Sequence, residues 1–239
     1  MPAYKSTKVI ENRQIASDIY FMKLDRPLGS KPGQFFMLRS EDFRGKPLLS
    51  RPFGVCDEDK ESISLLYQVK GEGTGLMKTF KKGKEVKVLG PLGRGFTLKE
   101  DKKIAIVGGG IGLAPLFFLA KKLKTQVDLY LGFSDYEYFS DYFKPYVNKV
   151  LVTIDKIDKK FITDAINPDD YDYIYACGPN PMLYSLSKKT KKARVEVSME
   201  AHMACGIGAC LGCTIRNAKG DFVRVCKDGP VFDSREVFG

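Results

Sequence analysis

The sequence predicts a multi-domain fold: an antiparallel β-barrel, then an α/β domain with a parallel sheet, then a small cysteine-rich module. Short apolar runs separated by Gly and Pro fill residues 1–98, and strand-like runs alternate with helical segments over residues 99–195. Residues 196–239 hold four of the six cysteines. With 44% hydrophobic and 28% charged residues, the 239-residue chain has an ordinary globular composition, which excludes a mainly disordered protein.

The first region contains short runs at regular spacing. They are Ser17–Leu24, Phe35–Arg39, Ser62–Val69 and Glu85–Leu89. Several of them alternate polar and apolar residues, as half-buried strands do, and turn signals such as Pro32-Gly33 and Gly90-Pro91 lie between them. Short strands at this spacing predict a small antiparallel barrel.

The second region alternates two kinds of apolar segment. The expected strands are Ile104–Val107, Val127–Leu131, Val150–Ile154 and Tyr173–Ala176, and the expected helices are Leu113–Leu123, Tyr136–Tyr142 and Pro181–Thr190. This alternation predicts βαβ units and a parallel sheet. We place the change from the first region to the second near the charged stretch Lys99–Lys103.

The excess of 39 Lys and Arg over 29 Asp and Glu gives a formal net charge of +10. The lysines are spread in small groups such as Lys81-Lys82 and form no basic stripe with interleaved aromatic residues. We therefore expect a solvated basic surface and no nucleic-acid partner. No run reaches the ~18 apolar residues of a membrane span, and no apolar segment follows the first residues, so we expect a cytoplasmic protein with no membrane partner.

Four cysteines follow the spacing C-x4-C-x2-C-x12-C. They are Cys205, Cys210, Cys213 and Cys226. This is the spacing of plant-type [2Fe–2S] ligands. The residues between the first three are almost all small, so the backbone can fold tightly and direct its N–H groups at the sulfur atoms. A structural zinc site and unligated thiols are the alternatives, although zinc sites more often pair two short cysteine knuckles.

The remaining candidate ligands have no partner at ligand spacing. Cys56 and Cys177 are therefore expected as buried small hydrophobic residues. His202 is the only histidine, which excludes a Rieske centre because that centre needs two, and we expect it to be structural.

A glycine-rich loop follows the expected strand Ile104–Val107. Its glycines are Gly108, Gly109, Gly110 and Gly112. A strand, a glycine turn and a helix start form an anion site, although Leu113 stands where the dinucleotide fingerprint has its third glycine. A second loop, Cys177-Gly178-Pro179, follows another strand, and both loops should lie at the carboxyl ends of parallel strands, where such folds bind ligands.

Two segments of the barrel region also point to a phosphorylated ligand. In Arg51-Pro52-Phe53-Gly54 the arginine can pair with a phosphate, and the backbone after it can face a flat ring. The strand Leu66-Tyr67-Gln68-Val69 leads into a glycine turn containing Gly73 and Thr74, which suits a pyrophosphate. Taken alone, each segment is also compatible with an ordinary barrel strand and its turn.

These motifs resemble those of the ferredoxin-reductase superfamily. Arg51-Pro52-Phe53-Gly54 resembles its R-x-x-S flavin motif, with Gly54 in place of the usual Ser and its hydroxyl. Gly73-Thr74 resembles its pyrophosphate turn, and Cys177-Gly178-Pro179-Asn180-Pro181-Met182 resembles its nicotinamide-side motif C-G-P-x-P-M. The resemblance implies an FAD-binding β-barrel at 1–98, an NAD-binding α/β domain at 99–195 and a [2Fe–2S] module at 196–239.

The stretches 199–213 and 226–232 resemble one branch of that superfamily, the electron-transfer subunits of class 1B NAD-dependent dihydroorotate dehydrogenases. The branch implies FAD, one [2Fe–2S] cluster and NAD(H) as substrate. It also implies an FMN-containing catalytic partner that oxidises dihydroorotate to orotate in pyrimidine biosynthesis, in a heterotetramer. Electrons would cross the cluster and FAD to NAD+, with no catalytic acid or base in this chain.

Two other functions fit parts of the pattern. Reductase subunits of hydrogenase, ferredoxin and bifurcating transhydrogenase complexes share the domain order and would take a different partner. A zinc-stabilised nucleotide-binding module would use the four cysteines for a metal without redox chemistry, but it leaves the flavin and nicotinamide motifs unexplained.

Overall fold

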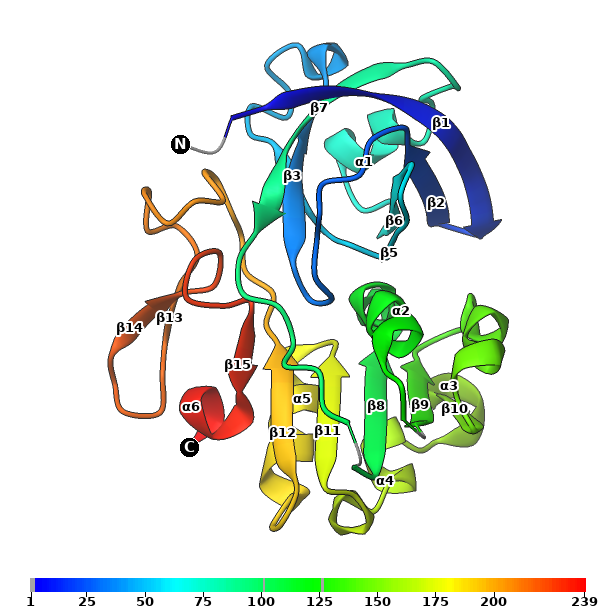
Figure 1. Ribbon diagram of the computed structural model, residues 1–239, viewed down its shortest axis with the longest axis vertical. Helices are drawn as coiled ribbons and strands as arrows, with labels where there is room; N and C mark the ends of the chain where they lie inside the picture. Colours follow the sequence, from blue (N-terminus) through cyan, green and yellow to red (C-terminus); the bar gives the residue numbers. More distant parts are fainter. Residues whose placement is uncertain (1–2, 101, 126) are drawn as a thin grey trace.

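The computed structural model describes residues 3–100, 102–125 and 127–239. Asp101, inside the stretch where we place the first boundary, lies outside the described residues. Figure 1 shows a barrel at the top, an α/β domain below it and the C-terminal module beside both. The two-domain core and its appended module confirm the predicted fold class.

The first sheet is antiparallel and has the strand order β4-β3-β7-β1-β2-β6-β5. Its strands are β1 (Lys5–Ala16), β2 (Ile19–Leu24), β3 (Phe35–Arg39), β4 (Arg51–Gly54), β5 (Asp57–Glu58), β6 (Ile63–Gln68) and β7 (Glu85–Leu92). The sheet curls until the Phe53 ring on β4 packs edge-on against Tyr67 on β6, with ring centroids 6.0 Å apart. Two short helices complete the barrel, η1 (Glu41–Phe43) and α1 (Glu72–Met77).

The second sheet has the order β10-β9-β8-β11-β12-β15, and all its pairs are parallel except the last. Its strands are β8 (Ile104–Gly109), β9 (Val127–Phe133), β10 (Lys149–Ile154), β11 (Tyr173–Cys177), β12 (Arg194–Ser198) and β15 (Val231–Asp233). Its helices are η2 (Gly110–Gly112), α2 (Leu113–Lys122), η3 (Ser140–Tyr146), α3 (Asp155–Asp158), α4 (Ile162–Ala165), η4 (Pro168–Asp170) and α5 (Asn180–Lys189). The chain leaves β8 toward β9 on one side and returns to β11 on the other, which makes the carboxyl end of β8 a topological switch point.

One expected helix is wrong in position. We expected a helix over Tyr136–Tyr142, but helical structure begins only at Ser140, in η3. Phe139 precedes it with a φ of 65°, a left-handed conformation that no helix can pass through. The Tyr136 side chain instead reaches across to the barrel, where its hydroxyl donates a hydrogen bond to Asp18. A tertiary contact therefore overrides the local helical pattern.

The third region is fastened to both domains. It contains β13 (Thr214–Arg216), β14 (Phe222–Arg224), β15 and α6 (Ser234–Phe238). β15 extends the α/β sheet by pairing with β12, and β12 itself crosses the division that we place at 195/196, so the domain limits stay predictions. On the barrel side, a Cβ added to Gly206 would lie 2.7 Å from Cγ of Met37. Among the described residues, we find no helix with the length and apolar character needed to span a membrane.

Candidate functional site

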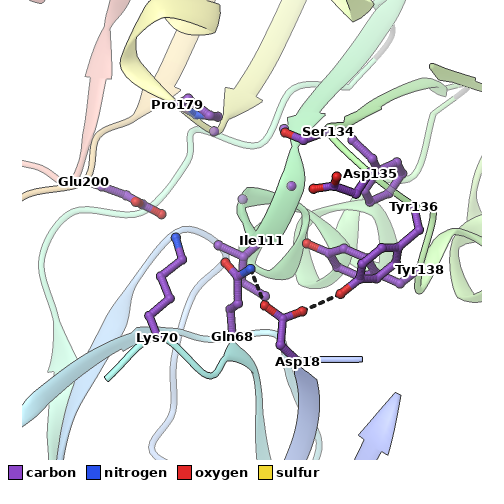
Figure 2. Close-up of a pocket in the computed structure, with 15 residues that line it drawn as sticks. Asp18, Gln68, Lys70, Ile111, Ser134, Asp135, Tyr136, Tyr138, Pro179 and Glu200 are labelled. Atoms are coloured by element: carbon purple, nitrogen blue, oxygen red, sulfur yellow. Dashed lines mark hydrogen bonds between the residues drawn. The ribbon is translucent and has the colours of Figure 1, made fainter. Parts of the chain in front are cut away.

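Two cavities meet where the three regions converge. The larger, of about 460 Å³, is the inter-domain pocket, which lies between the barrel and the carboxyl edge of the α/β sheet (Figure 2). The smaller has a volume of about 290 Å³ and is lined mainly by apolar side chains, among them the rings of Phe53 and Tyr67; we call it the ring cavity. The residues that line both cavities are Gln68, Lys70, Ile111, Gly112 and Glu200. A ligand in one cavity would therefore face a ligand in the other across a shared wall.

The ring cavity is built from all three regions. The barrel contributes Pro52–Gly54 and Leu66–Gln68, and Met199–Ala201, Met203 and Pro230 enter from the C-terminal side. Cys177 lies at the base of this cavity, only 3% exposed, and burial raises the pKa of its thiol to about 12, so it stays protonated. Cys56 is likewise fully buried, which confirms that both cysteines are small core residues.

One donor of the barrel arginine that the sequence singled out is buried without a partner, although the side chain as a whole is only partly buried. Nε of Arg51 is inaccessible and makes no hydrogen bond to any described residue. A buried cationic donor without a partner is costly, and a phosphate oxygen would satisfy it. Gly73 approaches closely, since an added Cβ would lie 3.4 Å from Cγ and Cδ of Arg51 and 3.0 Å from Cγ of Pro47. The residues present thus fit a phosphorylated ring compound such as a flavin nucleotide.

The expected glycine turn after β6 is instead the first turn of α1. Thr74 lies inside this helix, and its hydroxyl accepts hydrogen bonds from the N–H groups of Lys70 and Gly71 at 3.0 and 3.3 Å. The hydroxyl therefore caps the helix rather than standing free in a turn. A Cβ at Gly54 would only touch Pro115, at 3.4 Å, so the missing Ser hydroxyl is not dictated by lack of space.

The two loops of the α/β domain pack directly against each other, as their position at adjacent strand ends predicts. Gly108 of β8 is the parallel partner of Cys177 of β11. A Cβ on Gly112 would lie 2.5 Å from the carbonyl oxygen of Cys177, and one on Gly109 would lie 2.7 Å from Sδ of Met182. Only Gly110 combines a positive φ, 52°, with open space in front of it, toward the inter-domain pocket. Most of these glycines thus permit loop packing, and Gly110 also leaves open space on the side of the inter-domain pocket.

A third cavity, of about 440 Å³, continues from the glycine loop along the strand ends. Gly110 and Pro179 line it on one side, and Asp155, Phe161 and Thr163 line it on the other. An extended dinucleotide could therefore follow the carboxyl edge of the sheet from the inter-domain pocket into this space.

The cysteine loop aims backbone donors at sulfur, as expected from its small residues. The N–H of Cys210 lies 3.4 Å from Sγ of Cys205, and the N–H of Cys226 lies 3.4 Å from Sγ of Cys213. Burial raises the pKa of Cys205, but the N–H groups of Ile207 and Cys210 outweigh it and lower that pKa to about 6. Such donors stabilise thiolates, which are the form that binds metal.

Backbone hydrogen bonds connect the four cysteines two by two. The N–H groups of Cys210 and Cys226 donate to Sγ of Cys205 and of Cys213, respectively. A [2Fe–2S] cluster takes two protein ligands on each iron, so this pairing suits it. Within the described ranges, no group of three or more His, Cys, Asp or Glu side chains is arranged as a preformed metal site. His202, the only histidine, is exposed.

Sequence reasoning missed several residues that line the inter-domain pocket from both sides. They are Asp18, Lys70, Ser134, Asp135, Tyr136, Tyr138 and Glu200. The residues 134–138 directly follow β9, and the carboxyl end of a parallel strand is a signal that could have found them. Asp18 and Lys70 carry no such signal, because they reach the pocket only through the packing of the barrel against the α/β domain.

The fold and the site together define a class of protein: an electron-transfer protein of the ferredoxin-reductase type. The chain superposes on a solved NADH-dependent reduced ferredoxin-NADP oxidoreductase, studied for flavin-based electron bifurcation, with a TM-score of 0.85 and 26% identity. That match covers 97% of this chain and 89% of the other. The model of the iron–sulfur cluster binding domain of dihydroorotate dehydrogenase B matches residues 200–238.

Proteins of similar sequence identify the family within this class. The dihydroorotate dehydrogenase B (NAD(+)) electron transfer subunit of Clostridium acetobutylicum is 43% identical over 98% of this chain and 97% of its own length. The subunit of the same name from Caldanaerobacter subterraneus is also 43% identical, over 96% of both chains. The chain belongs to this family of dihydroorotate dehydrogenase B electron transfer subunits, as the sequence motifs predicted.

Proposed function

We propose that this chain carries electrons between an FMN-containing dihydroorotate dehydrogenase subunit and NAD+, through one [2Fe–2S] cluster and one FAD. The observation that carries the proposal is the ring cavity, which adjoins the inter-domain pocket on one side and is lined by the C-terminal module on the other. A two-electron nucleotide and a one-electron cluster require a carrier between them that handles both, and only a flavin-like ring fits that place.

The ligand sets follow from the motifs and their positions. Cys205, Cys210, Cys213 and Cys226 would hold the cluster, paired as their backbone N–H···Sγ hydrogen bonds connect them. FAD would be held by Arg51, Pro52, Phe53, Gly54, Leu66, Tyr67, Gln68, Val69, Gly73 and Thr74. NAD(H) would be held by Gly108, Gly109, Gly110, Gly112, Cys177, Gly178 and Pro179. Of this last set, Gly109, Gly110 and Pro179 line both spaces along the strand ends, and Gly112 and Gly178 line the inter-domain pocket.

When bound, the flavin exchanges a hydride with the nicotinamide and single electrons with the cluster. The residues of this chain bind and orient these groups. The unpartnered Nε of Arg51 would pair with a phosphate oxygen, and the Phe53 and Tyr67 rings would form an apolar wall that excludes water. The Tyr67 side chain is 1% exposed, and its hydroxyl donates a hydrogen bond to Oδ1 of Asn12. Tyr67 therefore forms part of the wall and is not assigned as a proton donor to the bound groups. No catalytic acid or base is assigned to this chain.

The catalytic partner would dock near the cysteine loop. Ile207 and Leu211 lie between the ligand cysteines with 42% and 61% of their surfaces exposed, and an apolar edge beside a cluster suits a protein interface. We propose a heterotetramer with two copies of each subunit. The cytoplasmic location expected from the sequence stays a prediction.

The first experiment is a visible absorbance spectrum of the anaerobically purified protein, before and after addition of NADH. We expect flavin bands with a broad iron–sulfur shoulder, and both should bleach with NADH. A colourless protein that contains zinc would overturn the electron-transfer role. If the bands bleach but coupled NAD+ reduction fails with an FMN-containing dihydroorotate dehydrogenase subunit, the chain serves another complex, such as a hydrogenase or a bifurcating enzyme.

A further inference from the structure

A carboxylate at the tip of a barrel hairpin joins the two walls of the inter-domain pocket. Asp18 lies in the two-residue turn between β1 and β2. One carboxylate oxygen accepts a hydrogen bond from the Tyr136 hydroxyl, and the other accepts one from Nε2 of Gln68 at 2.6 Å (Figure 2). The Asp18 carbonyl also accepts the N–H of Val69 at 2.8 Å. All three of its acceptor groups are thus used.

The partners of Asp18 belong to different walls. Tyr136 follows β9 and lines the nucleotide side of the inter-domain pocket. Gln68 ends β6 and lines both the inter-domain pocket and the ring cavity. The carboxylate therefore ties the α/β wall, through a single residue, to the barrel strand that faces the ring cavity. We call Asp18, Gln68 and Tyr136 the clasp.

A second inter-domain contact lies outside the pocket. Nη2 of Arg13, on β1, donates to the Tyr142 hydroxyl at 3.0 Å, and its guanidinium lies 5.3 Å from the centre of the Phe21 ring. Phe21 in turn stacks on Phe139, with centroids 6.4 Å apart. Tyr136 and Tyr142 thus belong to the same segment and bond to the same hairpin, but only Tyr136 lines the pocket.

We propose that Asp18 is a positioning residue for hydride transfer, acting through Gln68 and Tyr136 to fix the distance between the two reacting rings. This role rests on the proposed function. A nicotinamide in the inter-domain pocket would be placed by the α/β wall, and a flavin in the ring cavity by the barrel strand. Reacting atoms must approach to about 3–3.5 Å, and a misplacement of 1 Å can cost about 100-fold in rate. The clasp is the polar contact that sets this spacing inside the pocket.

The test is anaerobic stopped-flow reduction of the bound flavin by NADH in the full chain with its cofactors. Tyr136→Phe keeps the ring as a wall and removes only the bond to Asp18. We expect its limiting rate constant to fall about 10- to 100-fold, while the dissociation constant of NAD+ changes less than about threefold. The primary isotope effect with NADH deuterated at nicotinamide C4 should rise, and the long-wavelength absorbance of stacked nicotinamide and flavin should weaken.

Tyr142→Phe is the matched control, because it loses one hydroxyl bond from the same segment to the same hairpin outside the pocket. Its rate should stay within about twofold of wild type. Asp18→Asn should slow reduction as Tyr136→Phe does, and the double variant should be no slower than the slower single variant, because the clasp acts as a unit. Asp18→Asn also provides an independent variant where Tyr136→Phe fails to fold.

Three results would overturn the positioning role: wild-type rates in both clasp variants, equal slowing by Tyr142→Phe, or fully additive losses in the double variant. Flavin that NADH fails to reduce even in the wild-type protein would instead refute the proposed function, and the role of Asp18 with it. The two failures are distinguishable because the first requires a wild-type protein that reacts.

Discussion

The cysteine loop and the glycine loop both depend on small residues, but for different physical reasons. In the cysteine loop, Gly206 and Gly208 have φ values of 73° and 81°, so glycine is required by the local backbone path. In the glycine loop, Gly112 has an ordinary helical φ of −60°, and glycine is required because another loop passes 2.5 Å from where its Cβ would be. The first requirement already exists in the local backbone, although Gly206 also packs against Met37 of the barrel, whereas the second exists only after two segments have met.

The largest expected effect comes from breaking the local site. Cys210→Ser removes one of the four proposed sulfur ligands, and a hydroxyl is a poor substitute for a thiolate on iron. We expect loss of the cluster and coupled NAD+ reduction below about 1% of wild type, because no other one-electron route is built into the chain. The partner's own FMN reaction with an artificial acceptor should be unchanged. The measurement is iron content together with the coupled assay in the complex.

Ala209→Ser is the control for that experiment, because it introduces a hydroxyl in the same exposed loop without removing a sulfur. It should retain the iron and the coupled activity. Intact coupled turnover in Cys210→Ser would show that electrons do not pass through the cluster, and the relay assignment would have to be abandoned.

A smaller effect is expected from the site assembled by packing. Gly112→Ala would push a methyl group into the backbone of Cys177 and Gly178, with contacts of 2.5–2.7 Å. Neither backbone can move without displacing its parallel strand, so we expect a loss of about 1–3 kcal/mol in the free energy of unfolding and weaker NAD+ binding. Denaturant titration and NAD+ titration measure the two effects.

Gly75→Ala is the matched control for that substitution. Gly75 lies in α1 with no atom within 4 Å of an added Cβ, so alanine there should be neutral or stabilising by about 0.5–1 kcal/mol. If Gly112→Ala were equally harmless, the close approach of the second loop would not be what requires glycine at this position.

The same contrast explains what the sequence could predict. The run Ile104–Val107 is apolar at every position because both faces of its strand are buried, so it was identified from pattern alone. β1 was missed because most of its twelve residues, including Lys8, Glu11 and Arg13, are polar and at least partly exposed. The helix expected at Tyr136 was misplaced because the tyrosine contacts a residue 118 positions away.

The candidate site divides in the same way. The four cysteines could be predicted as a candidate ligand set from the sequence, because three of them lie in one short segment and few side chains other than cysteine can bind an iron–sulfur cluster. The clasp could not, since Gln68 and Tyr136 lie 50 and 118 positions from Asp18, and the hydrogen bonds that join the three residues exist only after the barrel has packed against the α/β domain. Ligands concentrated in one loop leave a pattern in the sequence, whereas a pocket formed between domains leaves isolated polar residues.

The smallest expected effect is the pH dependence of the stability that the clasp contributes. The hydrogen bond from the Tyr136 hydroxyl lowers the pKa of Asp18 below its ordinary value. Burial opposes this shift, and the hydrogen bond from Gln68 and the charge of Lys70 reinforce it. The bond to Asp18 also raises the pKa of Tyr136. Burial, with smaller contributions from Tyr136 and Asp18, raises the pKa of the neighbouring Tyr138 as well. The clasp therefore consists of an ionised aspartate and a protonated tyrosine over the whole neutral range.

The sign of the pH dependence follows from these directions. A lowered aspartate pKa contributes stability that is present above the unfolded value of about 4 and is lost as the pH falls through the folded pKa. A raised tyrosine pKa contributes stability that is present below about 10 and is lost as the pH rises through the folded pKa. The stability difference between wild type and Tyr136→Phe should thus be about 1 kcal/mol and flat from pH 6 to 9, and it should vanish in acid. Thermal unfolding across this range measures it, and a difference that persists at pH 2 would mean that the tyrosine hydroxyl stabilises the pocket without the charge of Asp18.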